Sequence, residues 1–418
     1  MKINRQPGET PKAEPGAKNP DISKLIRASR EKMPDPKESW VPKVEAEKIL
    51  RVNEVRDKYN LTGKGVGVAV IGSGFEYPGY TLKAWKDFAY GTKKPTDLSG
   101  HETHCVGDVL NMAPEADIIG IRVEEAPNNN VLAKAVDWAT KNKDKYGIKV
   151  INLSCGEIRR GRPLNSPPYI GLEPDPIDGA IARAHRAGIS VIAASGNEGR
   201  DPYTIGAIGD APEAITVGST VDDKILRSNS SCGPVLTGSE KPDVVAPGEF
   251  IVSLNCPRSK QYDQMRKNWQ QGSKIFPSLT DREDMRDWAR EADEIRGMND
   301  KQLREFLEND PRERELDGLD YTFRWQPAQM LAQKVKTQQY KASLVAGEGF
   351  LVGSGTSFSC PEVAGIAALL YQAKPDLKPD QLKAALKETA RDLGYQRSEQ
   401  GAGMVDALSA VERVLKNR

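Results

Sequence analysis

Residues 66–74 read VGVAVIGSG, an apolar run that ends in a glycine-bearing turn. Similar short runs, rich in Val, Ile and Ala, follow at residues 118–121, 149–153, 189–194 and 214–217. Helix-like segments separate several of them, for example residues 132–142 and 176–187. Apolar runs buried on both faces and separated by helices indicate a parallel sheet that is covered on each side. The sequence therefore predicts an α/β fold.

A serine occupies the start of a second informative segment. Residues 355–365 read GTSFSCPEVAG and lead into the apolar helical run 366–370. A hydroxyl at a helix N-terminus is accessible, and the backbone N–H groups of the first turn have no intrahelical partners. Ser357 is therefore placed to act as a nucleophile, although the common role of a serine at the start of a helix is that of a cap.

Several further motifs accompany these two segments along the chain. They are GHETHCVG at 100–107, VINLSCG at 150–156, VIAASGNEG at 191–199, KPDVVAPG at 241–248 and GAGMVDA at 401–407. In this order and spacing the set resembles the subtilisin-like serine proteases, or subtilases, from about Thr62 to Val411 with one large interruption. The layout is most similar to the intracellular bacterial members. The resemblance implies a subtilisin-like parallel β-sheet with helices on both faces.

The resemblance also implies roles for individual residues. Ser357 matches the nucleophile, and His101 matches the general base that takes its proton. Asn197 matches the side-chain donor of the oxyanion hole, which works together with the backbone N–H of Ser357. An extended peptide is expected to add as a strand along a substrate-binding edge. That edge is matched by Ser154, Cys155 and Gly156.

Two positions near the base depart from the family pattern. Gly72 stands where the family has its aspartate, the acid that orients the histidine, and Glu102 stands where the family has glycine. One hypothesis is that Glu102, or alternatively Glu76, reaches into the space left by Gly72 and hydrogen-bonds the imidazole. The alternative is that Glu102 is a first-turn helix acid that faces solvent. Glu362, where the family usually has histidine, is expected to alter the nucleophile helix or to bind a partner.

Three functions are compatible with this pattern. The first is a serine endopeptidase that uses Ser357 and His101 and lacks the usual aspartate. The second is a catalytically silent subtilase scaffold, a pseudoprotease that binds a peptide or a protein partner. The third is an ordinary enzyme in which Gly72 was introduced to silence it. The expected ligand is in each case a polypeptide.

The three histidines limit the options for a metal site. His104 follows His101 by one helical turn, but no HExxH motif or cysteine cluster supplies the remaining ligands of a metal site. The resemblance implies that His104 is a structural neighbour of the base. His185 lies near a predicted helix end, where a cation is favoured. We therefore expect no metal ion and no other cofactor.

Composition narrows the setting of the protein. The 418 residues carry a formal net charge of +1, which gives no overall field for nucleic acid or an anionic membrane. No apolar run has the length of a signal peptide or a membrane span, and the five cysteines form no CxxC pair. These features predict a cytoplasmic protein.

The chain is expected to divide into three parts. Residues 1–45 are rich in Pro, Lys, Glu and Gly and are predicted to be a flexible N-terminal arm with one short helix near 22–28. Residues 46–255 and 342–415 form the catalytic domain. Residues 256–341 carry helix-start signals and one-sided apolar patterns, which predict a helical insertion. One interpretation is that the insertion is a lid, or a surface that binds a protein partner. The other is that it is a surface elaboration without a function.

Overall fold

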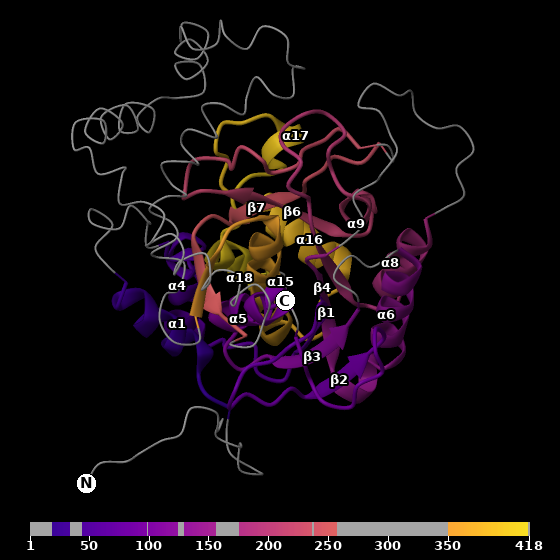
Figure 1. Cartoon of the computed structure of the whole chain (residues 1–418). Helices are drawn as coiled ribbons and strands as arrows, with labels where there is room; N and C mark the ends of the chain where they lie inside the picture. Colours follow the sequence, from indigo (N-terminus) through magenta and orange to yellow (C-terminus); the bar gives the residue numbers. More distant parts are fainter. Residues whose placement is uncertain are drawn as a thin grey trace, which may run out of the picture. The chain divides into compact units, whose positions relative to one another are not determined.

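A seven-stranded sheet carries the site, and all of its neighbouring strands pair in parallel. The computed structural model, shown in Figure 1, describes residues 19–33, 44–97, 99–123, 129–155, 175–235, 238–256 and 350–416. The strand order is β2-β3-β1-β4-β5-β6-β7. The strands are β1 (Gly67–Gly72), β2 (Ala84–Asp87), β3 (Asp117–Arg122), β4 (Ile148–Leu153), β5 (Ser190–Ala194), β6 (Ile215–Thr220) and β7 (Val244–Pro247). The predicted α/β fold is confirmed.

Strands β1 and β3 to β6 arise from the apolar runs that predicted them. The edge strand β2 was not predicted, because its sequence Ala-Trp-Lys-Asp is short, polar and only partly buried. An antiparallel pair, β8 (Ile251–Leu254) and β9 (Phe350–Gly353), stands apart from the main sheet.

Helices cover both faces of the sheet. On one face α6 (Asn129–Lys141) and α8 (Pro176–Arg186) bury apolar side chains against alternate residues of the central strands. On the other face α5 (His101–Met112) packs along α15 (Thr356–Ala373), which contacts strands β4 to β7. Both predicted helices are present. The helix expected at 132–142 spans Asn129–Lys141, and the helix expected at 176–187 spans Pro176–Arg186.

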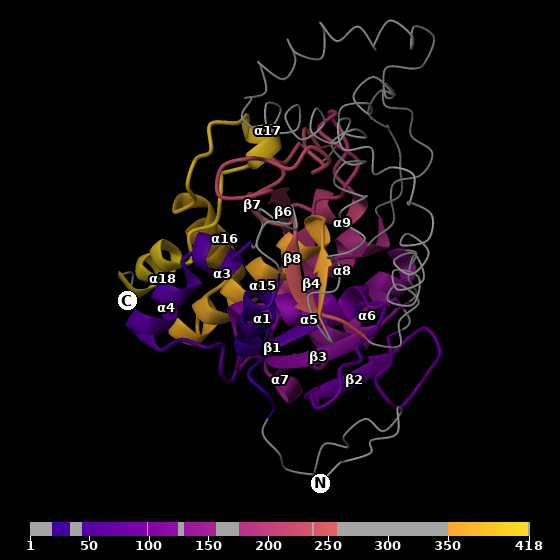
Figure 2. The ribbon, with the colours of Figure 1, turned by 60° about the vertical axis from the view of Figure 1, so that its left-hand side comes forward.

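Helix α15 is the central helix of the domain. Nearly all of its residues are buried, from Thr356 to Ala373, as expected for a helix that is apolar on every side. Figure 2 shows α15 and α5 side by side, with α1 (Ile22–Glu31) next to α5. The shorter helices are α3 (Ala46–Ile49), α4 (Val52–Tyr59), α7 (Lys143–Tyr146), α9 (Ala207–Asp210), α16 (Pro379–Glu388), α17 (Arg397–Gln400) and α18 (Ala407–Lys416).

Helix α1 corrects part of the expectation for the N-terminal arm. Ile22 and Ile26 are fully buried, and Arg30 donates to Glu47 Oε2 over 2.9 Å and to the carbonyl of Val44 over 2.8 Å. Residues 19–33 are thus anchored to the domain rather than free, because the helix has an apolar face and a buried ion pair. Residues 1–18 and 34–43 lie outside the described residues.

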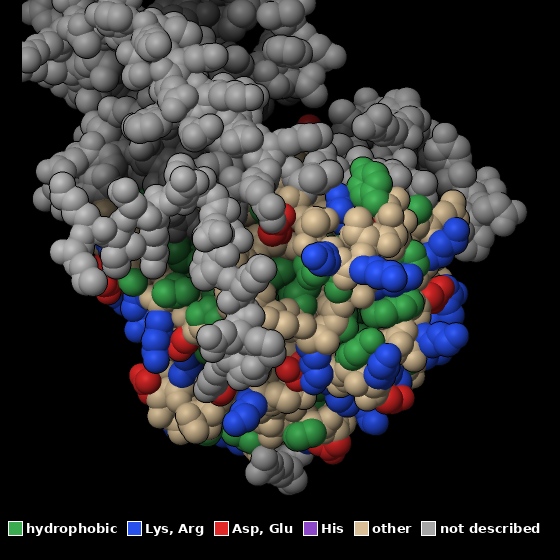
Figure 3. Space-filling view, turned by 60° about the horizontal axis from the view of Figure 1, so that its bottom comes forward, with side chains coloured by type: hydrophobic (Ala, Val, Ile, Leu, Met, Phe, Trp, Pro, Cys, Tyr) green, Lys and Arg blue, Asp and Glu red, His purple; other side chains and the backbone are tan. Residues whose placement is uncertain are grey.

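The predicted helical insertion, 256–341, lies outside the described residues except for Cys256. In the described ranges no helix is both long enough and apolar enough to cross a bilayer. Basic and acidic side chains are interspersed on the face shown in Figure 3, in keeping with the small net charge.

Candidate active site

The predicted site residues meet at the carboxyl edge of the sheet. Gly72 ends β1, Ser154 directly follows β4, and Asn197 lies three residues beyond β5. His101 is the first residue of α5, and Ser357 is the second residue of α15. The carboxyl ends of parallel strands and the N-termini of the two packed helices therefore bring these side chains together.

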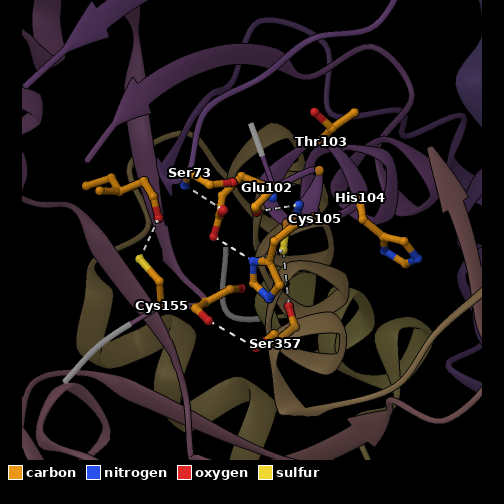
Figure 4. A network of polar contacts seen from close by, with 12 residues as sticks. Ser73, Glu102, Thr103, His104, Cys105, Cys155 and Ser357 are labelled. Carbon is orange, nitrogen blue, oxygen red and sulfur yellow. Dashed lines mark hydrogen bonds and ion pairs between the residues drawn. The ribbon is translucent and has the colours of Figure 1, made fainter. Parts of the chain in front are cut away.

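The carboxylate of Glu102 contacts the imidazole of His101, with Glu102 Oε1 lying 2.8 Å from His101 Nδ1. The backbone N–H of Ser73 donates to Glu102 Oε2 over 2.6 Å, a contact that Figure 4 shows. The Glu102 side chain is only 2% exposed, so the alternative of a solvent-facing acid is wrong. Of the two carboxylates considered from the sequence, Glu102 rather than Glu76 makes the contact.

Gly72 provides the space that the Glu102 carboxylate occupies. A Cβ atom at position 72 would lie 2.0 Å from both Cδ and Oε1 of Glu102. Such a contact is far inside van der Waals range, so a side chain at position 72 and the observed Glu102 conformation exclude each other. The two departures from the family pattern are therefore parts of one arrangement.

The first turn of α5 is fixed by a buried aspartate that the sequence analysis missed. Asp97 Oδ1 accepts hydrogen bonds from Ser73 Oγ over 2.8 Å and from the N–H of Gly100 over 2.9 Å. Its Oδ2 accepts from the N–H of Thr103 over 3.0 Å and from Thr103 Oγ1 over 2.7 Å. Asp97 therefore caps the helix and ties it to the loop after β1. The available signal was an aspartate a few residues before a helix start.

The electrostatics of the pair favour a charged imidazole beside a carboxylate. Burial opposes a positive charge on His101, but the Glu102 carboxylate and the Cys105 sulfur outweigh it and raise the His101 pKa well above 6.5. Burial likewise opposes ionisation of Glu102, but His101 and the hydrogen bonds from Ser73 lower its pKa below 4.5. The Glu102 carboxylate thus favours the protonated form of the neighbouring imidazole.

The Ser357 hydroxyl donates to the carbonyl of Ser154 over 3.0 Å. Among the described residues, no hydrogen bond joins Ser357 Oγ to His101. In enzymes, hydrogen bonds between catalytic groups are commonly long or misaligned until substrate binds.

Cys105 contacts the backbone of Ser357. Pro361 lies four residues after Ser357 and has no N–H to donate to the Ser357 carbonyl. The Cys105 thiol approaches that carbonyl at 3.4 Å and thereby supplies a weak donor. Burial raises the Cys105 pKa to about 12, so the thiol stays protonated at neutral pH.

Asn197 lies with its amide oxygen directed toward the protein. Its Oδ1 accepts from the N–H of Thr356 over 3.0 Å and from Arg227 Nη1 over 3.2 Å. Asn197 itself is exposed, and none of the hydrogen bonds among the described residues uses its Nδ2. The Nδ2 donor is thus left for a ligand. Arg227 was missed by the sequence analysis, because its loop carries no motif.

The expected substrate edge is described only in part. Ser154 is buried, and Cys155 is partly buried with its thiol donating to the carbonyl of Ile71 over 3.3 Å. Burial raises the Cys155 pKa well above 9. Gly156 lies outside the described residues.

One group of metal-ligand atoms occurs among the described residues. It consists of His101, Glu102 and Cys105, whose donor atoms lie within 4.8 Å of one another. The 2.8 Å contact between Nδ1 and Oε1 leaves no room for an ion, so we assign no metal here. His104 does not join the group, because it contacts Asp108 Oδ2 at 3.0 Å and the Ile251 carbonyl at 3.2 Å.

Glu362 is not available to a partner, contrary to one of the expectations from the sequence. Its side chain is fully buried in α15, and neither carboxylate oxygen has a hydrogen-bond partner among the described residues. Burial, with a smaller contribution from Asp108, raises its pKa well above 4.5. The interior therefore favours the protonated form of Glu362.

Comparisons with known proteins agree with this architecture. The family model described as "Subtilase family" matches residues 63–275 and 316–405. Serine protease AprX of Bacillus subtilis (strain 168) is 30% identical over 386 residues, which cover 85% of this chain and 68% of that protein. Subtilisin BL of Lederbergia lenta is 31% identical over 206 residues, covering 46% of this chain and 67% of that protein.

Solved structures support the fold alone. The crystal structure of MycP1 with the N-terminal propeptide removed aligns with a TM-score of 0.54 at 21% identity, covering 88% of this chain and 96% of that one. A structure described as proteases from Pseudoalteromonas arctica PAMC 21717 aligns with a TM-score of 0.53 at 19% identity, covering 87% and 94% of the two chains.

Proposed function

Because the chain belongs to the subtilase family, we propose that it is a serine endopeptidase in which Glu102 replaces the usual aspartate. The observation that carries the proposal is the 2.8 Å contact between Glu102 Oε1 and His101 Nδ1. The contact lies in the space that Gly72 leaves open. The chain has therefore lost an acid on β1 and holds one on α5 at the same side of the imidazole.

Each group has a defined task in this mechanism. His101 Nε2 takes the proton of Ser357 as Oγ attacks the scissile carbonyl, and returns it to the leaving amine. Glu102 accepts the Nδ1–H hydrogen bond, which fixes the tautomer and stabilises the imidazolium. Asn197 Nδ2 and the backbone N–H of Ser357 stabilise the oxyanion. Water then hydrolyses the acyl-enzyme by the same steps.

The substrate is proposed to be an extended polypeptide bound through its backbone along the edge at Ser154 and Cys155. We further propose a cytoplasmic location, because all five cysteines are free thiols, which suits a reducing compartment. A protein partner at the insertion, residues 256–341, stays a prediction.

A pseudoprotease is the second candidate, and one observation favours it. The Ser357 hydroxyl donates to the Ser154 carbonyl and not to His101. A chain that keeps this geometry with a peptide bound would recognise polypeptides without cleaving them.

Labelling with a fluorophosphonate serine-hydrolase probe separates the two functions. We expect the parent chain to label and Ser357→Ala not to. Glu102→Gln should label about 10⁴-fold more slowly, because loss of a triad acid costs roughly this much. Glu54→Gln is a matched control, since Glu54 is also a first-turn helix glutamate but pairs with Arg51 at the surface.

One outcome would count against the peptidase, and a different one against the role of Glu102. A parent chain that does not label but still binds peptide is a scaffold. Labelling that depends on Ser357 but is unchanged by Glu102→Gln would leave the peptidase standing and remove Glu102 from its mechanism.

A further inference from the structure

Arg227 contacts both the carboxylate of Glu249 and the side-chain amide of Asn197, the residue proposed for the oxyanion hole. Its Nε donates to Glu249 Oε2 in a close ion pair, and its Nη1 donates to Asn197 Oδ1 over 3.2 Å. The side chains of Arg227 and Glu249 are each only 14% exposed. The Arg227 backbone is fixed as well, because its N–H donates to the Ser219 carbonyl over 2.9 Å. The guanidinium is therefore held from two sides.

The Asn197 side chain needs this support because an amide can turn over at little steric cost. Its oxygen and nitrogen are nearly the same size, so a rotation of about 180° exchanges an acceptor for a donor. With Oδ1 outward, the amide would repel a developing oxyanion. The N–H of Thr356 and the Arg227 guanidinium donate to Oδ1, and the Thr356 hydroxyl makes a longer contact of 3.4 Å with it. The acceptor capacity of the amide oxygen, two lone pairs, is therefore filled from the protein side.

Arg227 is the stronger of the two restraints on the amide. A hydrogen bond from a charged donor is roughly twice as strong as one between neutral groups. The turned amide would also place its NH₂ group against the guanidinium, donor against donor. The Arg227 charge itself is offset by Glu249, so it acts through Asn197 rather than directly on the oxyanion.

We propose that Arg227, held by Glu249, is a positioning residue that keeps the Asn197 amide nitrogen directed toward the oxyanion. This inference rests on the proposed peptidase function. It predicts that Arg227 contributes to turnover while contributing little to substrate binding, because the oxyanion exists only after attack.

A double-mutant cycle with Asn197 tests the proposal in the full chain. Arg227→Met should lower kcat about tenfold and leave KM within about twofold, since coupled neighbouring groups commonly interact on this scale. In an Asn197→Ala background the same change should alter kcat by less than about twofold. Arg227→Lys keeps the charge but not the fork that reaches both partners, so it should restore only part of the loss.

The control is Arg183→Met, which removes another arginine that pairs with a carboxylate, Asp137, on the opposite layer of helices. It should leave kcat unchanged. An unchanged kcat in Arg227→Met would overturn the proposal, and so would an equal loss with and without Asn197.

The Asn197 side-chain amide gives a readout that does not need activity. In a chain labelled with ¹⁵N-asparagine, its NH₂ signals are assigned by their loss in Asn197→Ala. Arg227→Met should shift and broaden these signals, whereas Arg183→Met should not. If the parent proves inactive while Arg227→Met still moves them, the peptidase function fails and the positioning role stands. Unmoved signals would overturn the positioning role whatever the activity.

Discussion

Substitution of Gly72 by alanine tests the relocated acid with a single methyl group. The new Cβ would lie 2.0 Å from Oε1 and Cδ of Glu102, whereas ordinary van der Waals contact begins near 3.4 Å. The difference is about 1.4 Å, which the Glu102 carboxylate must move. A displacement of this size is enough to break the 2.8 Å contact to His101, because a hydrogen bond tolerates only a narrow range of distance and angle.

The expected consequence is a large loss of turnover with a modest loss of stability. Loss of the triad acid sets an upper limit of roughly 3 × 10⁴-fold on kcat, and we expect Gly72→Ala to lower kcat by about 10³ to 10⁴. Overpacking should lower the free energy of unfolding by about 1–3 kcal/mol. The assay is hydrolysis of a fluorogenic peptide library, with the rate of fluorophosphonate labelling measured in parallel and urea unfolding for stability.

Matched variants isolate the cause. Gly179→Ala is the control, because its Cβ would meet only the flexible end of Arg183 at 3.3 Å.

Gly72→Asp alone should resemble Gly72→Ala, since its Cβ meets the same carboxylate. Gly72→Asp combined with Glu102→Gly removes the clash and returns the acid to the strand, so it should recover activity. A Gly72→Ala chain with kcat within about threefold of the parent would refute the reasoning, because loss of a working acid costs far more.

Three further predictions concern titration and stability. The Glu102 carboxylate raises the His101 pKa, and His101 must be neutral to act as a base. Glu102→Gln should therefore move the acid limb of the pH profile of kcat/KM to lower pH. An acid limb that stays at the same pH would contradict this prediction. Because the Glu362 pKa is raised in the folded state, the folded chain keeps a proton that the unfolded chain loses, and stability falls by about 1.4 kcal/mol per pH unit as pH rises above about 4.5. Glu362→Gln removes this titration, so its stability relative to the parent, measured by urea unfolding at several pH values, should increase as pH rises above about 4.5. A difference in stability that does not change with pH would contradict the prediction. Arg30→Met leaves Glu47 buried without its partner and should cost about 3–5 kcal/mol, most of it recovered by adding Glu47→Leu.

Sequence patterns predicted the sheet because its central strands are buried on both faces. The runs that became β1, β3, β4, β5 and β6 are apolar without alternation, so their burial is encoded locally. The carboxyl ends of these strands also placed Gly72, Ser154 and Asn197 at one edge. The arm was predicted less well, because the burial of Ile22 and Ile26 depends on α5, which lies far along the sequence.

The contact between Glu102 and His101 was one of three alternatives that the sequence left open, beside a contact from Glu76 and a solvent-facing Glu102. A glutamate next to the base has a favourable place at a helix N-terminus whether it faces solvent or the imidazole. The choice is made by the empty volume at Gly72 and by the N–H of Ser73, both of which come from another element. Asp97 had a local signal, an aspartate shortly before a helix start, but its hydrogen bond to Ser73 joins two separate elements. The roles of Arg227 and Glu249 depend on contacts between distant loops, which no local pattern encodes.

The mutual exclusion of a side chain at position 72 and the carboxylate of Glu102 also constrains how such a site can arise. An ancestor with aspartate at position 72 and glycine at position 102 cannot reach the present pair by one substitution. Gaining Glu102 first would force two acids into a volume that holds one, whereas losing the aspartate first would leave the histidine without an acid. Either route passes through a poor enzyme, so the two positions are expected to change together in descent, each making sense only in the presence of the other.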